Sequence, residues 1–335
     1  MRLLGGLPEP FLRAIGGSPV RVDGQELHPE MQLLLKLLSL SGQPSLGELS
    51  VPEARAARAR AAAMFGGSPI PARVEEVGIP GAGGTIEARL YAPENGDAPL
   101  PLLVYYHGGG WVICDLDTHD NVCRFLSREA GVAVLSVDYR LAPEHPFPAA
   151  VDDALAAFRF AVDNAALLGA DSGAIGVGGD SAGGCLAAVT AQLTLGAGAL
   201  RPAFVFMLYP VTDLSSKSRS YELFGDGFFL TEGDMDWFRG HYLPDEAAAL
   251  DARASPLLAE DLSGFPATYI ATAGFDPLRD EAELYARRLR EAGTPVALRR
   301  HEGMIHGVAN VLGMGSVGRK VMLEAAGAVR MGLAT

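Results

Sequence analysis

The sequence predicts an α/β protein with a mostly parallel, twisted eight-stranded sheet and helices on both of its faces. Two observations carry this prediction. Short apolar runs recur from residue 74 onward, and helix-like stretches separate the later runs. Such strand and helix alternation implies right-handed crossovers, and ligands then bind at the carboxyl ends of the parallel strands.

The first 70 residues differ in composition and pattern from the rest of the chain. They are rich in alanine and leucine and predict two helices, one with Met31, Leu34 and Leu38 on a single face and one over 52–64. A Gly-Gly-Ser-Pro run then closes the unit. Residues 1–70 are therefore predicted to form an N-terminal helical cap segment.

Eight strands are expected in the remainder. Their ranges are 74–79, 86–91, 102–106, 132–137, 174–178, 203–208, 267–273 and 296–301. Five helices are expected among the later strands, at 119–130, 148–163, 182–195, 278–291 and 317–330. Residues 71–210 and 266–335 are therefore predicted to form the core.

The connection 211–265 interrupts this alternation of strands and helices. It is longer than an ordinary connection. It also contains seven large aromatic residues: Tyr221, Phe224, Phe228, Phe229, Trp237, Phe238 and Tyr242. We expect an inserted second cap segment here, which forms a lid together with the N-terminal helices.

Composition excludes several classes of function. A formal net charge of -13, with no local Lys/Arg cluster, argues against binding to nucleic acid or to an anionic membrane. The N-terminus does not resemble a secretory signal, and no segment approaches the roughly 20 apolar residues of a membrane span. Cys114, Cys123 and Cys185 form no C-x-x-C pair, which suits a reducing compartment. We expect a cytoplasmic protein.

Ser181 is the candidate nucleophile. It stands in Gly-Asp-Ser-Ala-Gly over 179–183, after a predicted strand and before a predicted helix, which is the context of a nucleophile elbow. The glycines two residues to either side are needed because a side chain there would collide with a neighbouring element. Since the chain has 41 glycines, the pentapeptide alone is weak evidence.

A much rarer pattern, His-Gly-Gly-Gly over 107–110, follows the predicted strand 102–106. Consecutive glycines let bare backbone approach a substrate and aim successive N–H groups at one point. We expect the amides of Gly108, Gly109 and Ala182 to form an oxyanion hole.

A serine nucleophile needs a base and an acid, in the chain order serine, acid, histidine. His241, His301 and His306 follow Ser181, and His306 is the candidate because it lies in a loop after the last predicted strand. Asp276 ends a predicted strand and is the candidate acid, with Asp280 as the rival. An Asp before a Pro is also a good helix N-cap, so Asp276 could serve both purposes.

Two further patterns are decoys. Residues 313–318 satisfy G-x-G-x-x-G, but 17 residues after them leave no room for the rest of a dinucleotide-binding unit. His301 and His306 are five residues apart rather than the four of H-E-x-x-H, and no third ligand is evident, so we expect no metal site.

Five motifs together resemble the bacterial hormone-sensitive-lipase-like esterases, which are family IV carboxylesterases. They are HGGGW at 107–111, DYRLAPE at 138–144, GDSAGG at 179–184, DPLRD at 276–280 and IHG at 305–307. The resemblance runs from about residue 75 to the C-terminus. It implies an α/β-hydrolase core with a helical cap, no cofactor, a homodimer, and a small short- to medium-chain acyl ester as substrate.

The sequence departs from that family at two positions, Cys114, where relatives usually carry Gly, and Val308, where they usually carry Phe. These departures bear on substrate preference. Two alternatives stay open beside a serine carboxylesterase. One is an amidase or deacetylase with the same triad, and the other is a non-catalytic receptor on the same fold, against which the retained His306 argues.

Overall fold

The sheet has eight strands in the order β10-β9-β8-β7-β5-β6-β4-β3. Their bounds are β3 Arg73–Gly81, β4 Gly84–Ala92, β5 Leu100–Tyr106, β6 Ala133–Val137, β7 Ala170–Asp180, β8 Val205–Leu208, β9 Thr268–Phe275 and β10 Val296–Ile305. Only β4 runs against its neighbours, β3 and β6, and the other adjacent pairs are parallel. This confirms the predicted eight-stranded, mostly parallel sheet.

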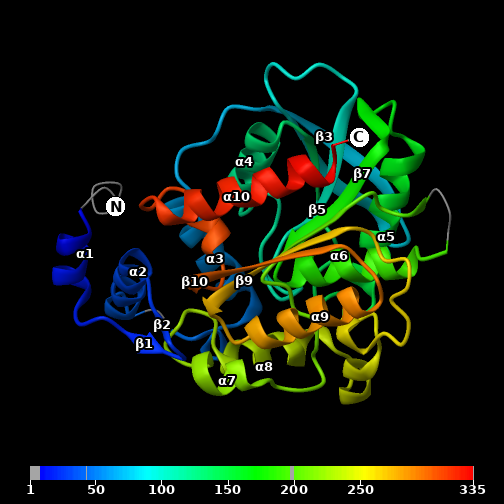
Figure 1. Cartoon of the computed structure of the whole chain (residues 1–335). Helices are drawn as coiled ribbons and strands as arrows, with labels where there is room; N and C mark the ends of the chain where they lie inside the picture. The colour runs from blue at the N-terminus through cyan, green and yellow to red at the C-terminus, as the bar shows by residue number, and fades with distance from the viewer. Residues whose placement is uncertain (1–7, 43, 197–199, 335) are drawn as a thin grey trace.

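The computed structural model describes residues 8–42, 44–196 and 200–334. Helices α4 (Asp120–Ala130) and α10 (Val317–Gly332) cover one face of the sheet, and α5 (Ala149–Asp163), α6 (Ala182–Leu193) and α9 (Arg279–Glu291) cover the other (Figure 1). The five predicted core helices are therefore present, each with bounds close to those expected.

Side chains of β5 show why this sheet forms a two-sided core. Leu102, Val104 and Tyr106 face the helices α5, α6 and α9, whereas Leu103 and Tyr105 face α4 and α10. All five are fully buried. A strand covered on both faces has no polar side, so it forms a continuous apolar run rather than an alternating pattern.

The N-terminal segment contains α1 (Glu9–Gly16), α2 (Pro29–Leu40), the short helix η1 (Leu46–Glu48) and α3 (Val51–Phe65). It also contains a hairpin of two short strands, β1 (Arg21–Val22) and β2 (Gln25–Glu26), which the sequence analysis did not anticipate. Asp23 and Gly24 form its two-residue turn with φ of 54° and 76°. Two consecutive positive φ angles are typical of a type I′ hairpin, for which Asp-Gly is a favoured sequence.

Three polar contacts fasten this segment to the core. Gln25 Nε2 donates to the carbonyl of Gly274 at 2.7 Å. The His28 amide donates to the Gly303 carbonyl at 2.9 Å. The buried carboxylate of Glu30 accepts hydrogen bonds from the first amides of α10, those of Ser316 and Val317. The N-terminal helices are therefore held against the strand ends of β9 and β10.

The connection after β8 contains α7 (Arg219–Phe224), α8 (Glu232–Tyr242), η3 (Glu246–Leu250) and η4 (Pro256–Leu258). Its aromatic residues are used for packing. Tyr242 stacks on Trp111 with ring centroids 4.2 Å apart, and Phe224 packs against Phe275 at the end of β9. No helix in the described ranges is long and apolar enough to cross a membrane.

Candidate active site

Ser181 occupies the sharp turn between β7 and α6. Its φ of 55° and ψ of -119° lie outside the regions that side chains prefer, and its amide donates to the Leu208 carbonyl at 2.8 Å. A Cβ atom on Gly183 would lie 1.9 Å from the carbonyl oxygen of Tyr106, and one on Gly179 would lie 2.3 Å from the same oxygen. This confirms the expectation that both flanking glycines are sterically required.

The structure brings together the three candidates for the triad. His306 Nε2 lies 3.0 Å from Ser181 Oγ, and His306 Nδ1 lies 2.8 Å from Asp276 Oδ2. All three residues are buried, with exposed fractions of 8% for Ser181, 7% for His306 and 0% for Asp276. The geometry is that of a serine hydroxyl donating to an imidazole whose second nitrogen donates to a carboxylate.

The rival residues lie elsewhere. His241, in α8, packs edge-on against Trp237. His301 lies within β10, opposite Ala273 of β9. Asp280 accepts a hydrogen bond from Arg279 Nε at 2.8 Å and is paired with no histidine in the described part of the chain. Of the residues considered, only His306 and Asp276 contact Ser181 or each other.

Both oxygens of the Asp276 carboxylate are engaged, one by the loop after β9 and one by His306 after β10. Asp276 Oδ1 accepts the amide of Leu278 at 2.9 Å, which leaves Oδ2 for His306. Helix α9 begins at Arg279, so its N-cap position is Leu278 rather than Asp276. Asp276 could have capped this helix as well, but it does not occupy the N-cap position, because the turn places its carboxylate on the Leu278 amide, before the first helical residue.

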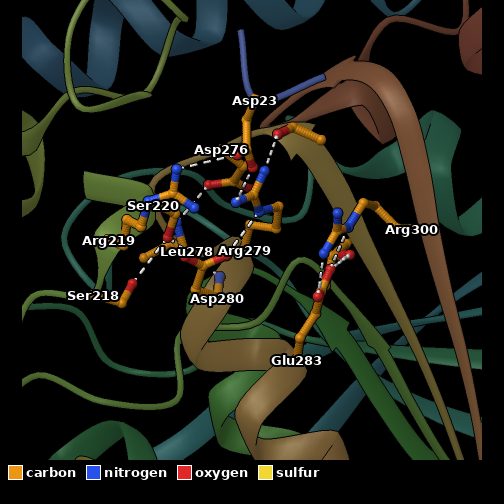
Figure 2. Close-up of polar contacts among 12 residues, drawn as sticks. Asp23, Ser218, Arg219, Ser220, Asp276, Leu278, Arg279, Asp280, Glu283 and Arg300 are labelled. Carbon is orange, nitrogen blue, oxygen red and sulfur yellow. Dashed lines mark hydrogen bonds and ion pairs between the residues drawn. The ribbon is translucent and has the colours of Figure 1, made fainter. Parts of the chain in front are cut away.

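Arg279 connects this loop to the N-terminal hairpin. Figure 2 shows its guanidinium between the carboxylates of Asp23 and Asp280, with nitrogen to oxygen distances of 2.9 and 2.8 Å. Arg279 also donates to the Gly274 carbonyl and is 3% exposed. Arg219 makes a second, more exposed ion pair with Asp23 at 3.3 Å. Residues 23 and 279 thus tie the acid-bearing loop to the hairpin, a contact that sequence reasoning missed.

The glycine loop after β5 departs from the expectation at one residue. The Gly108 amide donates to Asp180 Oδ1 at 3.0 Å, so it is not free to bind a substrate oxygen. Within the described ranges, the amides of Gly109, Gly110 and Ala182 have no acceptor. These three amides, rather than the predicted set with Gly108, are the donors available near Ser181.

Close packing explains the glycines of this loop. Gly109 has a φ of 116°, and a Cβ atom there would lie 2.2 Å from the Ile113 carbonyl oxygen. Gly110 has a φ of 58°, and its Cβ would meet the ring of Phe238. The backbone can therefore approach the cavity only because side chains are absent.

Asp180, the residue before the serine, anchors the glycine loop. Besides Gly108 it accepts the Tyr105 hydroxyl at 2.7 Å, and His119 Nε2 lies 3.2 Å from Oδ1. Burial by itself disfavours the Asp180 carboxylate, but His119 and Tyr105 outweigh it and hold its pKa below the usual range. A fully buried anion thus links the loop to the elbow.

His107 makes the free energy of unfolding depend on pH. It is fully buried and stacks on Tyr139, and burial lowers the pKa of its imidazole to about 4. The unfolded chain takes up this proton near pH 6.5, so the free energy of unfolding should fall between pH 6.5 and 4, by about 3 kcal/mol from this group. Urea unfolding at a series of pH values measures the slope.

Asp138 has the opposite effect on stability, because burial raises its pKa to about 6 and its protonation favours the folded state as the pH falls. The contribution of His107 is therefore isolated by comparing variants with the parent. The slope should be shallower in His107→Gln than in the parent. His145→Gln is the matched control, since His145 is exposed, and it should leave the slope unchanged. An identical slope in the parent and in His107→Gln would contradict the account.

Comparison with known proteins identifies the family. A profile described as alpha/beta hydrolase fold matches residues 103–310, which span the elbow, the acid and the histidine. Carboxylic ester hydrolase LipN of Mycobacterium tuberculosis is 46% identical over 323 residues, 94% of this chain and 86% of its own. The chain belongs to the hormone-sensitive-lipase-like esterases of the α/β-hydrolase fold.

Other esterases support the same placement. The ethyl acetate hydrolase of Pseudomonas putida is 41% identical over 238 residues, which cover 70% of this chain and 74% of that protein. An ester hydrolase from the metagenome of Lake Arreo, solved with a derivative of bipyridine phosphonate, has a TM-score of 0.88 and 43% identity over 92% of this chain and 100% of its own. The similarity therefore extends over the N-terminal segment as well as the core.

In this esterase a cavity of about 210 Å³ lies above Ser181 and His306. Besides the elbow and the segment that carries His306, three further parts of the chain line it. The glycine loop contributes Gly109 and Gly110, the N-terminal helices contribute Met31, Leu34 and Phe65, and the connection after β8 contributes Phe229, Met235 and Phe238. The walls are mostly apolar, which suits the acyl chain of an ester.

Cys114 and Val308, the two departures from the family, both line this cavity. Cys114 is buried and has a positive φ of 73°, a conformation that glycine adopts without strain. Its Sγ lies 2.9 Å from the point where a Cβ on Gly109 would be. The thiol therefore narrows the cavity beside the glycine loop.

Proposed function

We propose that the chain is a serine carboxylesterase that hydrolyses short- to medium-chain acyl esters through an acyl-enzyme intermediate. The observation that carries this proposal is the continuous hydrogen-bonded chain from Ser181 through His306 to Asp276 at the floor of an apolar cavity. Similarity to a carboxylic ester hydrolase and to an ethyl acetate hydrolase supports it.

In the proposed mechanism His306 takes the proton of Ser181 as its oxygen attacks the ester carbonyl. Asp276 fixes the imidazole in the tautomer that accepts at Nε2, and it stabilises the imidazolium that forms. His306 then gives the proton to the departing alcohol. Water enters and loses a proton to His306 as its oxygen attacks the acyl carbon. His306 then returns that proton to Ser181 Oγ as the acid is released.

The amides of Gly109, Gly110 and Ala182 are the proposed oxyanion hole. As the carbonyl carbon becomes tetrahedral, its oxygen gains negative charge, and fixed N–H donors stabilise it without reorganisation. Removing one donor of this kind costs about 3 kcal/mol in other enzymes. The Gly108 amide has an indirect role here, because its bond to Asp180 sets the position of the two glycines that follow.

We infer that residues 1–70 and 211–265 act as a two-part cap over Ser181. Side chains from both parts line the cavity, and α8 lies against η1. We also propose a cytoplasmic location and a homodimer. Cys114, Cys123 and Cys185 are all unpaired and buried, which suits a reducing compartment. The homodimer rests on the family resemblance, and light scattering tests it, since a mass of 35.1 kDa is that of one chain.

A substrate series tests the proposed function. We expect kcat/KM for 4-nitrophenyl esters to be highest at short to medium acyl chains and to fall for long chains, because residues of both cap segments line the cavity. The value for the matched 4-nitroanilide should be far lower, because an amine leaving group must be protonated as it departs. An anilide turned over as fast as its ester would instead indicate an amidase. Binding of esters without turnover would indicate a receptor.

A further inference from the structure

Helix α3 presents one stripe of side chains to the active-site cavity. The stripe consists of Ala54, Ala57, Arg58, Ala61, Ala62 and Phe65. Their spacing of three and four residues places them on a single face of the helix. Arg58 is the only charged member of this face, and the others are small or aromatic.

The position of α3, and with it Arg58, is fixed by Arg55 one turn earlier. The Arg55 guanidinium makes two hydrogen bonds to the carboxylate of Glu144, at 2.8 and 2.7 Å. Its Nε also donates to the Val112 carbonyl at 2.9 Å, just beyond the glycine loop. Because a bidentate arginine pair fixes orientation as well as distance, α3 is held in register with that loop.

The Arg58 guanidinium lies beside the glycine loop. Its Cζ is 5.8 Å from the centroid of the Phe229 ring. Burial raises the pKa of the neighbouring Cys114 thiol, and the nearby positive charge of Arg58 lowers it. Since the Cys114 sulfur borders Gly109, the positive charge faces the same space as the proposed oxyanion hole.

Arg58 has no carboxylate partner within ion-pair distance in the described part of the chain, whereas Arg55 has one. The acidic residues that share the cavity wall are already engaged. Asp234 Oδ2 accepts the Thr231 amide at 3.0 Å, and Asp180 accepts Tyr105 and Gly108. The Arg58 guanidinium therefore lies over an aromatic ring in a mostly apolar cavity without a counterion. A carboxylate that entered this cavity would form a strong, charge-assisted pair of hydrogen bonds with it.

We propose that Arg58 is a specificity residue that binds a free carboxylate on the substrate. The favoured substrates are then small esters that carry a second, ionised acid group, such as monoesters of dicarboxylic acids. This inference rests on the proposed esterase function and narrows its substrate class. The carboxylate is held by the planar fork of the guanidinium while Ser181 attacks the ester carbonyl in the same cavity.

Two pairs of esters test the proposal. Mono-4-nitrophenyl glutarate and 4-nitrophenyl valerate differ by a carboxylate on the acyl part, and 4-carboxyphenyl valerate and phenyl valerate differ by one on the alcohol part. In Arg58→Gln the ratio of kcat/KM, charged ester over neutral ester, should fall at least about tenfold in one of the pairs. Arg58→Lys, which keeps the charge, should retain part of the ratio.

Arg60→Gln is the matched control, because Arg60 is exposed on the same helix and does not line the cavity. It should leave both ratios unchanged. The proposal is overturned if Arg58→Gln, folded by circular dichroism, keeps both parental ratios or lowers all four rates alike. Failure of the esterase function itself would look different, since the parent would then hydrolyse neither neutral ester.

Discussion

Replacing Ser181 with alanine is expected to reduce kcat for 4-nitrophenyl butyrate by at least about a thousandfold. The change removes the only oxygen that lies 3.0 Å from His306 Nε2 in the described structure. The proposed oxyanion amides and the cavity remain, so a small residual rate above that of water should persist. Initial rates at saturating substrate measure the loss.

The loss should be chemical rather than structural. In the described structure the hydroxyl makes one hydrogen bond, to His306, while the strained turn depends on backbone packing and on the flanking glycines. Urea unfolding of Ser181→Ala should therefore stay within about 1 kcal/mol of the parent. Ser263→Ala, at an exposed serine, is the matched control and should keep full activity. A Ser181→Ala enzyme with more than about a tenth of parental activity would rule out Ser181 as the nucleophile.

The second large effect is expected at the acid. Asp276→Asn should lower kcat by about a thousandfold or more, because an amide in place of Oδ2 disfavours the histidine tautomer that accepts the serine proton and cannot neutralise the imidazolium. The carboxylate is fully buried against His306, so solvent cannot replace it. The same ester assay measures this effect.

Asp280→Asn is the matched control, since it makes the same chemical change four residues later. The Asp280 carboxylate faces Arg279 rather than His306, so the kcat of this variant should stay within about tenfold of the parental kcat. If Asp280→Asn were nearly inactive and Asp276→Asn active, Asp280 rather than Asp276 would be the acid of the triad.

The sheet could be predicted from the sequence because its strands are buried on both faces. Runs such as 102–104 and 205–207 contain only apolar side chains, all of them buried, and turns separate them clearly from the amphipathic helices. The end of β10 was harder to predict. The expected strand stopped at residue 301, whereas β10 continues to Ile305 across a register shift, which brings its end to the neighbour of His306.

The first donor of the proposed oxyanion hole could not be predicted from the motif. Three successive glycines look equivalent in sequence, and the one whose amide is already occupied is determined by Asp180, 72 residues away. The acidic residue at the second position of the elbow pentapeptide was the available signal. Only the fold shows that its carboxylate points back to the Gly108 amide.

The N-terminal hairpin was missed for a different reason. Its strands contain two residues each, too few for a periodic pattern, although the Asp23-Gly24 turn was a usable local signal. Its contact with Arg279 joins residues more than 250 positions apart in the chain. Such a pair has no local signature, so the link between the hairpin and the acid-bearing loop required the three-dimensional structure.

The central claim is that distant loops converge on one reactive hydroxyl, and covalent trapping tests it most directly. The chain is treated with a 4-nitrophenyl alkylphosphonate, and the adduct is located by intact mass and peptide mapping. We predict one phosphonyl group per chain on Ser181, no labelling of Ser181→Ala and strongly slowed labelling of His306→Gln. An adduct on another residue, or undiminished labelling of Ser181→Ala, would contradict the account.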